Sequence, residues 1–241
     1  MSQSTYQNNL VRHLSPQDFE RLRRHLEPVP LKARQVLIQR NALVPYIYFP
    51  ESGQASVLAK VTGSEPIEVG MFGREGMSDM APSRKVPLET VMQIEGHGHR
   101  VEREVYSQVM SESVGLANLT SCWQHAQLVQ TAFTALSHGS FTVVERLARS
   151  LLMIHDRVEG DEMPLVHDHF AWMLAVRRAG VTEAFRTLKD AGGVWTGRAM
   201  VRIVDRQALV DAAHGSYGAA EAEYEKLFGC PLSKQPSQLS V

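Results

Sequence analysis

The chain has 241 residues, of which 44% are hydrophobic and 21% are charged, a composition typical of a globular protein with one large domain or two ordinary ones. Its formal net charge of −1 excludes attraction of the whole chain to nucleic acid or to an anionic membrane. The two cysteines form no CxxC pair, which excludes a cysteine-built metal site, and no apolar run approaches the length of a membrane span. The N-terminus has no signal pattern, so we expect a cytoplasmic protein with reduced thiols.

The first residues, 1–11, are polar, and we expect them to be frayed. A helix is predicted to begin after Ser15, because serine is a good N-cap and Pro16 suits the first helical position. Pro28 and Pro30 are expected to end this helix. Its apolar face consists of Phe19, Leu22 and Leu26.

Short segments rich in β-branched and aromatic residues follow, separated by Gly, Pro and Ser. This spacing predicts a small antiparallel β-barrel or sandwich, to which we assign residues 12–110. The segments are residues 35–39, 46–49, 55–61, 67–72, 90–95 and 99–101.

A glycine-rich stretch at residues 70–77 interrupts the strand pattern. Such a stretch brings backbone N–H groups close to an anion, although a simple connection between strands explains it equally well. The pair His97 and His99 lies on one face of a predicted strand, and His167 with His169 forms a similar pair farther on. Neither pair has the further ligands that a metal needs, so we interpret these histidines as ordinary polar residues.

The next predicted element is a long helix at residues 111–138, with an apolar seam that repeats every three and four residues. Seam residues are Leu116, Leu119, Trp123, Ala126, Gln130 and Phe133. A second stripe consists of Leu128, Ala132 and Leu136. Two stripes indicate burial on two sides, against the helix's own domain and against a second copy, so we expect a homodimer; an ordinary core helix is the alternative. His138-Gly139-Ser140 is the expected domain boundary.

Residues 140–220 have the pattern of a winged helix-turn-helix domain. An amphipathic helix over residues 144–154 leads to two shorter helical patterns that meet at Ala175-Val176-Arg177. The apolar face of the first short helix contains Phe170, Ala171 and Leu174, and that of the second contains Val181, Phe185 and Leu188.

A two-stranded hairpin is predicted after Gly192-Gly193, with strands at residues 194–196 and 200–204 and Arg198 at its tip. This hairpin is the expected wing. A last helix is expected at residues 207–213, followed by a tail at 221–241 that is disordered after about Pro231.

Charge is concentrated in this region although the whole chain is nearly neutral. From Arg177 to Arg206 there are seven Lys or Arg residues and three Asp or Glu residues. A local cationic patch on a helix-turn-helix predicts that the second helix enters a DNA major groove. A solvated helix face is the alternative on charge alone.

Four short motifs accompany this order of barrel, long helix and winged helix-turn-helix: Ile47-Tyr48-Phe49-Pro50-Glu51-Ser52-Gly53, Gly73-Arg74-Glu75-Gly76, Glu145-Arg146-Leu147-Ala148-Arg149 and Val176-Arg177-Arg178-Ala179-Gly180-Val181-Thr182. With these motifs, the chain resembles the Crp/Fnr family of bacterial transcription regulators over residues 14–220. The resemblance implies an α+β chain with a cyclic-nucleotide-binding-like jelly-roll sensor, a dimerisation helix and a DNA-binding domain. It also implies a homodimer that binds two-fold symmetric promoter DNA and contacts RNA polymerase.

This sequence departs from the family pattern at several positions. Ala179 replaces the usual Glu, Glu183 replaces the usual second Arg, and Ala175 replaces the common turn glycine. The cyclic-nucleotide signature requires an arginine for the cyclic phosphate, where this chain has Pro87-Leu88-Glu89-Thr90, so cyclic AMP is not the expected effector. The cysteine cluster of the oxygen-sensing branch is missing, so no iron–sulfur cluster and no other cofactor is expected.

We therefore expect a DNA-binding regulator that is not an enzyme, with an effector-sensing or degenerate barrel. Arg178 matches the family position that reads a base, most often guanine, next to Ala179, and phosphate contacts are expected from Arg177, Thr182, Arg186 and Arg198. A pocket for an unknown small effector would include Gly73, Arg74, Glu75, Gly76, Glu89 and Thr90. The alternative is a small-molecule-binding or protein-interaction module that has lost specific DNA binding.

Overall fold

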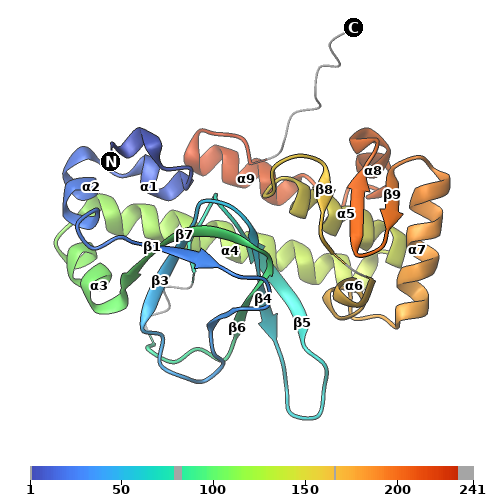
Figure 1. The fold of residues 1–241 in the computed structure, drawn as a ribbon, viewed down its shortest axis with the longest axis horizontal. Helices are drawn as coiled ribbons and strands as arrows, with labels where there is room; N and C mark the ends of the chain where they lie inside the picture. Colours follow the sequence, from blue (N-terminus) through green and yellow to red (C-terminus); the bar gives the residue numbers. More distant parts are fainter. Residues whose placement is uncertain (1, 79–82, 166, 233–241) are drawn as a thin grey trace, which may run out of the picture. The chain divides into compact units, whose positions relative to one another are not determined.

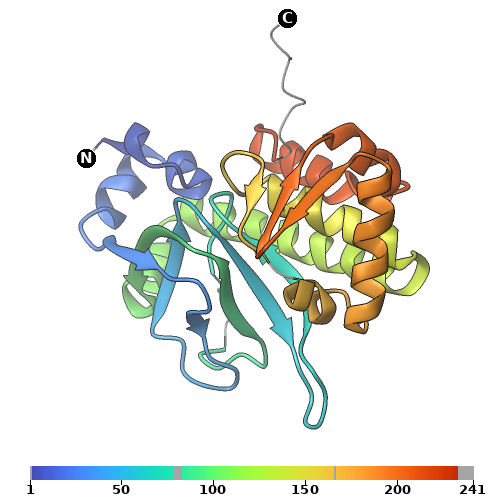
Figure 2. The same cartoon turned by 45° about the vertical axis from the view of Figure 1, so that its right-hand side comes forward.

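Two units, each with its own core, make up the computed structural model, which describes residues 2–78, 83–165 and 167–232 (Figures 1 and 2). Unit 1 comprises Met1–Lys60 and Val69–Leu128, and unit 2 comprises Val61–Glu68 and Val129–Val241. Over the described part of the chain, no helix combines the length and the apolar character that a membrane crossing requires.

Residues 2–11 of unit 1 form defined structure, so the prediction of fraying is wrong for them, and residue 1 lies outside the described residues. A 3₁₀ turn, η1 (Gln3–Thr5), precedes helix α1 (Asn9–His13), and the side chain of Asn8 caps α1 by accepting the N–H of Val11. Burial explains this order, because Tyr6, Leu10 and Val11 belong to the core. Helix α2 (Pro16–Leu22) begins as predicted, with the Ser15 side chain accepting the N–H of Asp18.

Two antiparallel sheets, which do not close into one barrel, form the β-structure of unit 1. One sheet has the order β1-β7-β3 and the other the order β2-β6-β4-β5. Every predicted segment overlaps a strand, and β1 is an additional one. The strands are β1 (Glu27–Leu31), β2 (Val36–Ile38), β3 (Tyr46–Pro50), β4 (Gln54–Ala59), β5 (Ile67–Phe72), β6 (Glu89–Ile94) and β7 (Gly96–Glu102).

Strand β1 was missed because its prolines were expected to mark the end of a helix and nothing more. Pro28 lies opposite His99 and Pro30 lies opposite His97. Proline cannot donate to a sheet ladder, but β1 is at the edge of its sheet, where the missing N–H is tolerated.

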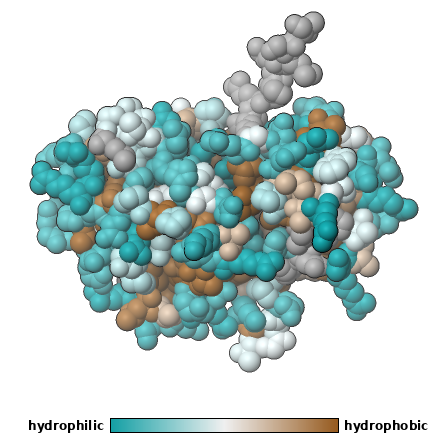
Figure 3. Space-filling model, viewed as in Figure 1, coloured by the Kyte–Doolittle hydropathy of each residue, from teal (hydrophilic) through white to brown (hydrophobic). Residues whose placement is uncertain are grey.

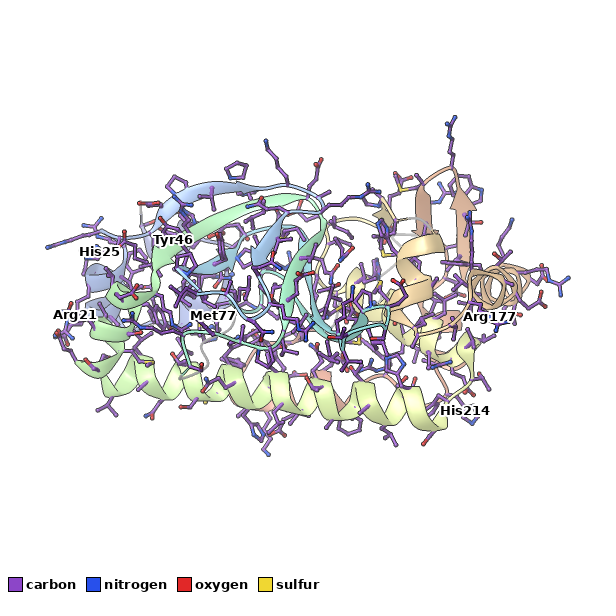
Figure 4. All side chains as sticks on the ribbon, turned by 90° about the horizontal axis from the view of Figure 1, so that it is seen from below. Arg21, His25, Tyr46, Met77, Arg177 and His214 are labelled. Carbon is purple, nitrogen blue, oxygen red and sulfur yellow. The ribbon has the colours of Figure 1, made fainter. Side chains whose placement is uncertain are left out.

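The predicted long helix is α4 (Val114–Ser140), which continues through the expected boundary at 138–140, and a separate helix, α3 (Arg103–Ser111), precedes it. Trp123 of α4 packs edge to face on Phe72, with ring centroids 6.4 Å apart. Its indole Nε1 donates to the carbonyl of Met77, 3.0 Å away, and Met77 lies between the strands and α4 in Figure 4.

Of the two predicted stripes on the long helix, the seam is the one that faces the chain's own interior. Leu116, Trp123, Ala126 and Gln130 are buried, whereas Leu119 and Phe133 are half-buried. The second stripe is the exposed one, since Leu128 is 67% exposed and Leu136 is 49% exposed. Most of the surface seen in Figure 3 is hydrophilic, and hydrophobic residues occur there in separate patches.

Unit 2 contains the predicted winged helix-turn-helix elements. Two further elements correct the prediction: β8, which adds a third strand to the wing sheet of order β8-β10-β9, and α9, in part of the expected tail. Helix α9 is held by the burial of Ala220, Tyr224 and Phe228, and the tail after residue 232 lies outside the described residues. The elements are α5 (Val143–His155), β8 (Glu162–Met163), α6 (His167–Met173), α7 (Arg178–Asp190), β9 (Val194–Gly197), β10 (Met200–Ile203), α8 (Arg206–Ala212) and α9 (Ala219–Phe228).

Candidate nucleic-acid interface

Helices α6 and α7 meet at the predicted turn and pack through aromatic residues. Phe170 of α6 and Phe185 of α7 are buried and lie edge to face, with ring centroids 5.2 Å apart. Val181 and Leu188 are buried on the same face of α7, as their spacing predicted. Ala171, expected on the apolar face of α6, is only half-buried.

The turn between the two helices has one residue in the left-handed region. Ala175 has φ of 52°, a conformation that costs an L-residue about 1–2 kcal/mol. The N–H of Val176 donates to the carbonyl of Ala171 at 2.9 Å. From α5, Nη1 of Arg146 donates to the carbonyl of Leu174 at 3.2 Å. Backbone and arginine together therefore fix the angle at which α7 leaves the turn.

Helix α5 contributes further hydrogen bonds through the motif Glu145-Arg146-Leu147-Ala148-Arg149. Glu145 forms a capping box with Thr142 at the start of α5. Arg149 is buried, and it donates from Nε to the carbonyl of Ser216 at 3.0 Å and from Nη2 to Oγ1 of Thr134 at 3.2 Å. Burial lowers the pKa of Arg149. The resemblance motif is thus a structural support within unit 2.

The N-terminal end of α7 presents cations to solvent. Arg177, Arg178, Ala179 and Thr182 are all exposed, and Arg177 lies at the start of α7, which Figure 4 shows nearly end-on. Thr182 donates to the carbonyl of Arg178 at 3.1 Å. The first N–H groups of a helix and its dipole favour anions at this end, and the arginines add to that preference.

Farther along α7, the guanidinium of Arg186 forms an ion pair with the carboxylate of Glu183. The hydrogen bond to Glu183 raises the pKa of Arg186. Both side chains are exposed, 69% for Arg186 and 61% for Glu183. Arg186, which is expected to contact a phosphate, therefore has a carboxylate beside its positive charge.

The wing carries Arg198 at its tip, where it is exposed beside Ala199, a residue with φ of 56°. On one face of the hairpin, the Trp195 ring covers Gly197, because a Cβ built on Gly197 would lie 2.3 Å from that ring. The guanidinium carbon of Arg202 lies 5.2 Å from the centroid of the Trp195 ring. The wing sheet lies beside α7, with β9 in contact with it (Figure 2).

Arg206, one of the cations counted in the local patch, is half-buried and is paired within unit 2. Its Nη2 donates to Oδ1 of Asp156 at 2.7 Å, and its Nη1 lies 2.9 Å from Nδ1 of His155. A guanidinium can only donate, so Nδ1 accepts and the imidazole proton is on Nε2, which donates to Asp161 at 2.9 Å. No pattern in the sequence indicated this network.

The predicted effector residues lie in unit 1, and the glycine-rich loop already uses its polar groups internally. The N–H of Gly73 donates to the carboxylate of Glu75 at 2.9 Å, and the carbonyl of Arg74 accepts the N–H of Asn9 at 2.7 Å. Gly76 lies against Trp123, whose ring would be 2.0 Å from a Cβ at this position. Glu89 and Thr90 are in β6, opposite Leu58 and Val57 of β4.

The histidine pairs have different surroundings. Nδ1 of His99 lies 3.2 Å from Oε1 of the buried Glu51, and Nδ1 of His97 lies 2.8 Å from the hydroxyl of Ser52. His169 is half-buried, and the side chain of His167 is outside the described set. Across the residues that the structure describes, no group of three or more potential ligands could hold a metal ion.

Comparison with known proteins matches residues 145–212 to the family model of the Crp-like helix-turn-helix domain. A protein from Eubacterium rectale, assigned to the Crp/Fnr family of transcriptional regulators, superimposes with a TM-score of 0.67 at 16% identity, over 86% of this chain and 98% of that one. FixK2 from Bradyrhizobium japonicum gives a TM-score of 0.68 at 17% identity, over 78% of this chain and 96% of that one. The c-di-GMP-responsive regulator CLP of Xanthomonas campestris gives 0.62 at 15% identity, over 79% and 100%. No curated protein sequence is significantly similar to the chain.

At 15–17% identity, the likeness to these solved structures shows a shared fold. Residues 145–212 match the Crp-like helix-turn-helix domain, and the chain as a whole shares the fold of solved structures that include a protein assigned to the Crp/Fnr family, the architecture that its motifs predicted.

Proposed function

We propose that the chain is a sequence-specific, DNA-binding transcription regulator whose helix α7 enters the major groove. The exposed cationic N-terminal end of α7, at Arg177 and Arg178, is the observation that carries the proposal. It projects from a Crp-like helix-turn-helix domain whose turn is fixed by Arg146. Recognition helices of this kind read bases with their N-terminal residues.

Arg178 is the proposed base contact, since a planar guanidinium donates two parallel hydrogen bonds to O6 and N7 of guanine. Ala179 leaves room for a base beside it. Arg177, Thr182 and Arg198 are the proposed phosphate contacts, because all are exposed on α7 or the wing. Arg186 joins them without leaving Glu183, because only one nitrogen of its guanidinium pairs with the carboxylate and a guanidinium has five N–H donors.

The regulator would act as a homodimer on two-fold symmetric promoter sites, with half-sites about one helical turn apart. The exposed stripe of α4, formed by Leu128, Ala132 and Leu136, is the proposed contact between copies, since large exposed apolar residues on one helix face suit a coiled-coil partner. The buried seam then supports α4 from within the protomer. RNA polymerase is the proposed partner on the promoter.

A small-molecule effector would bind to unit 1 near Gly73–Gly76, since this loop contacts α4 through Trp123. The matched folds include a c-di-GMP-responsive regulator and a protein from Silicibacter pomeroyi assigned as cAMP-binding, so the fold is compatible with more than one ligand class. Glu89 in β6 argues against an anionic cyclic phosphate at that strand.

Selection of bound sequences from random duplex DNA tests the proposal. Wild-type protein should select a two-fold symmetric site. Arg178→Ala and Arg178→Lys should both reduce discrimination at one base pair of each half-site, by about 1–3 kcal/mol, because lysine keeps the charge but loses the bidentate geometry. Arg177→Ala should weaken binding to all sequences equally. Selection of no preferred sequence, with little dependence of DNA affinity on salt, would favour a module without specific DNA binding.

A further inference from the structure

The outward side of α7 carries an acidic group at its centre. Val181, Ala184, Phe185 and Leu188 are buried and define the inward side of the helix. By the 3.6-residue period, the positions opposite to them are Ala179, Glu183, Arg186 and Asp190, all of which are exposed. A helix that lies in the major groove with its inward side on its own domain therefore directs Glu183 at the bases.

Arg186 pairs with Glu183, which orients the carboxylate and partly neutralises its charge. The ion pair with Arg186 lies one helical turn along α7 and occupies one carboxylate oxygen of Glu183. The second oxygen of a carboxylate remains an acceptor. Pairing with a cation also reduces the repulsion between Glu183 and the DNA phosphates, so the carboxylate can approach a base at lower electrostatic cost.

We propose that Glu183 is a specificity-determining residue that reads cytosine in each half-site, an inference that rests on the DNA-binding function proposed above. A carboxylate only accepts hydrogen bonds, and the cytosine edge in the major groove presents the N4 amino donor alone. Guanine presents the acceptors N7 and O6, and thymine presents the acceptor O4, so both repel a carboxylate. Adenine places its N7 acceptor beside its N6 donor and is a poorer partner.

Arg178 and Glu183 read different base pairs. Five residues of helix separate them by about 7.5 Å along the axis, about twice the 3.4 Å spacing of stacked base pairs. Arg186 is a positioning residue, because it acts on the base through Glu183. Each half-site therefore contains a guanine set by Arg178 and, at a separate base pair, a cytosine set by Glu183.

Sequence selection from random duplexes with the full-length protein tests this inference. For wild type we expect a conserved cytosine at one base pair of each half-site. Glu183→Gln should change that preference to adenine, because a glutamine amide donates to N7 and accepts from N6 of adenine. Glu183→Ala should remove the preference, a loss of about 10- to 100-fold in discrimination at this base pair alone. Arg186→Ala should weaken the cytosine preference and leave the guanine set by Arg178 unchanged.

Asp190→Asn is the matched control, since it changes a carboxylate to an amide on the same exposed side, two turns farther from the N-terminal end of α7. It should leave the selected sequence unchanged, and circular dichroism should show equal helix content in all variants. If wild type selects a motif and Glu183→Gln or Glu183→Ala selects the same one, the inference is wrong while the proposed function stands. If wild type selects no motif, both fail.

Discussion

The loop Gly73–Gly76 in unit 1 and the turn before α7 in unit 2 differ in where their polar groups are directed. In the loop, the N–H of Gly73 and the carbonyl of Arg74 have hydrogen-bond partners within unit 1. At the start of α7, Arg177 and Arg178 are exposed. A ligand at the loop must replace internal hydrogen bonds, whereas DNA at α7 meets side chains that already face solvent.

This difference in hydrogen bonding suggests a different function for each region. Binding that breaks and replaces hydrogen bonds couples a ligand to the structure around it, here to Trp123 and α4. Binding to an exposed, rigidly supported helix gives affinity and specificity with little rearrangement. The loop is thus suited to control by a bound effector, and α7 is suited to recognition of DNA. Variants in the two regions test this division, from the largest expected effect to the smallest.

Trp123→Ala should destabilise unit 1 around the loop Gly73–Gly76, against which the indole packs. Loss of a buried tryptophan and of its hydrogen bond to the Met77 carbonyl should lower the free energy of unfolding by about 3–5 kcal/mol. Chemical denaturation measures this loss. Asn118→Ala, an exposed change on the same helix, should have an effect below about 0.5 kcal/mol. A loss for Trp123→Ala no greater than that of the control would show that the loop is not held by the indole.

Arg146→Ala should loosen the support of the recognition turn. The guanidinium donates to the carbonyl of Leu174, and loss of a charged hydrogen bond costs about 1.5–3 kcal/mol. We expect lower stability together with weaker DNA binding, because α7 is no longer fixed at its turn. Arg186→Ala, which removes an exposed arginine from α7, should leave the free energy of unfolding almost unchanged. Equal unfolding energies for the two variants would contradict the supporting role of Arg146.

The helix-turn-helix was predictable because its signals are local. Val181, Phe185 and Leu188 repeat at the helical period, and Ala175, which replaces the common turn glycine, has φ of 52°. The wing hairpin has equally local turn signals at Gly197 and Arg198.

What the sequence did not indicate depends on contacts between distant segments. The seam of α4 repeats like a coiled-coil interface, but periodicity does not say whether the partner is another copy or the chain's own Met77 and Phe72. Arg206 counted as a surface cation until its contacts with Asp156 and His155 showed that it is paired within unit 2. Strand β1 was hidden by two prolines that only an edge strand accepts.

Ala175→Gly should raise the free energy of unfolding by relieving backbone strain in the turn before α7. Glycine avoids the cost of the left-handed region, about 1–2 kcal/mol, but loses about 0.5–1 kcal/mol through the entropy of the unfolded chain. A net gain of about 0.5–1 kcal/mol in the free energy of unfolding is therefore expected from thermal or chemical denaturation. Ala191→Gly is the matched control, since Ala191 ends α7 with φ of −77° and has no such strain to relieve. Destabilisation by both changes would show that the turn is not strained.

Acidification should lower the stability of unit 2 through His138, and we expect this effect to be the smallest of those considered. Burial, and then the nearby Arg146, 3.4 Å from Nδ1, lower the pKa of His138 below its ordinary value of about 6.5. The unfolded chain therefore binds a proton at a higher pH than the folded chain does. The contribution of His138 to stability is fully present above the unfolded pKa and is lost as pH falls through the folded pKa.

Melting temperatures at pH 7.5 and 5.5 measure this difference. Wild type should lose more stability on acidification than His138→Gln, which cannot gain the proton. His214→Asn is the matched control for the removal of a histidine, because His214 is exposed and has φ of 49°, a conformation that asparagine tolerates. If the melting temperatures of His138→Gln and wild type fall equally between pH 7.5 and 5.5, Arg146 does not disfavour the protonated form of His138.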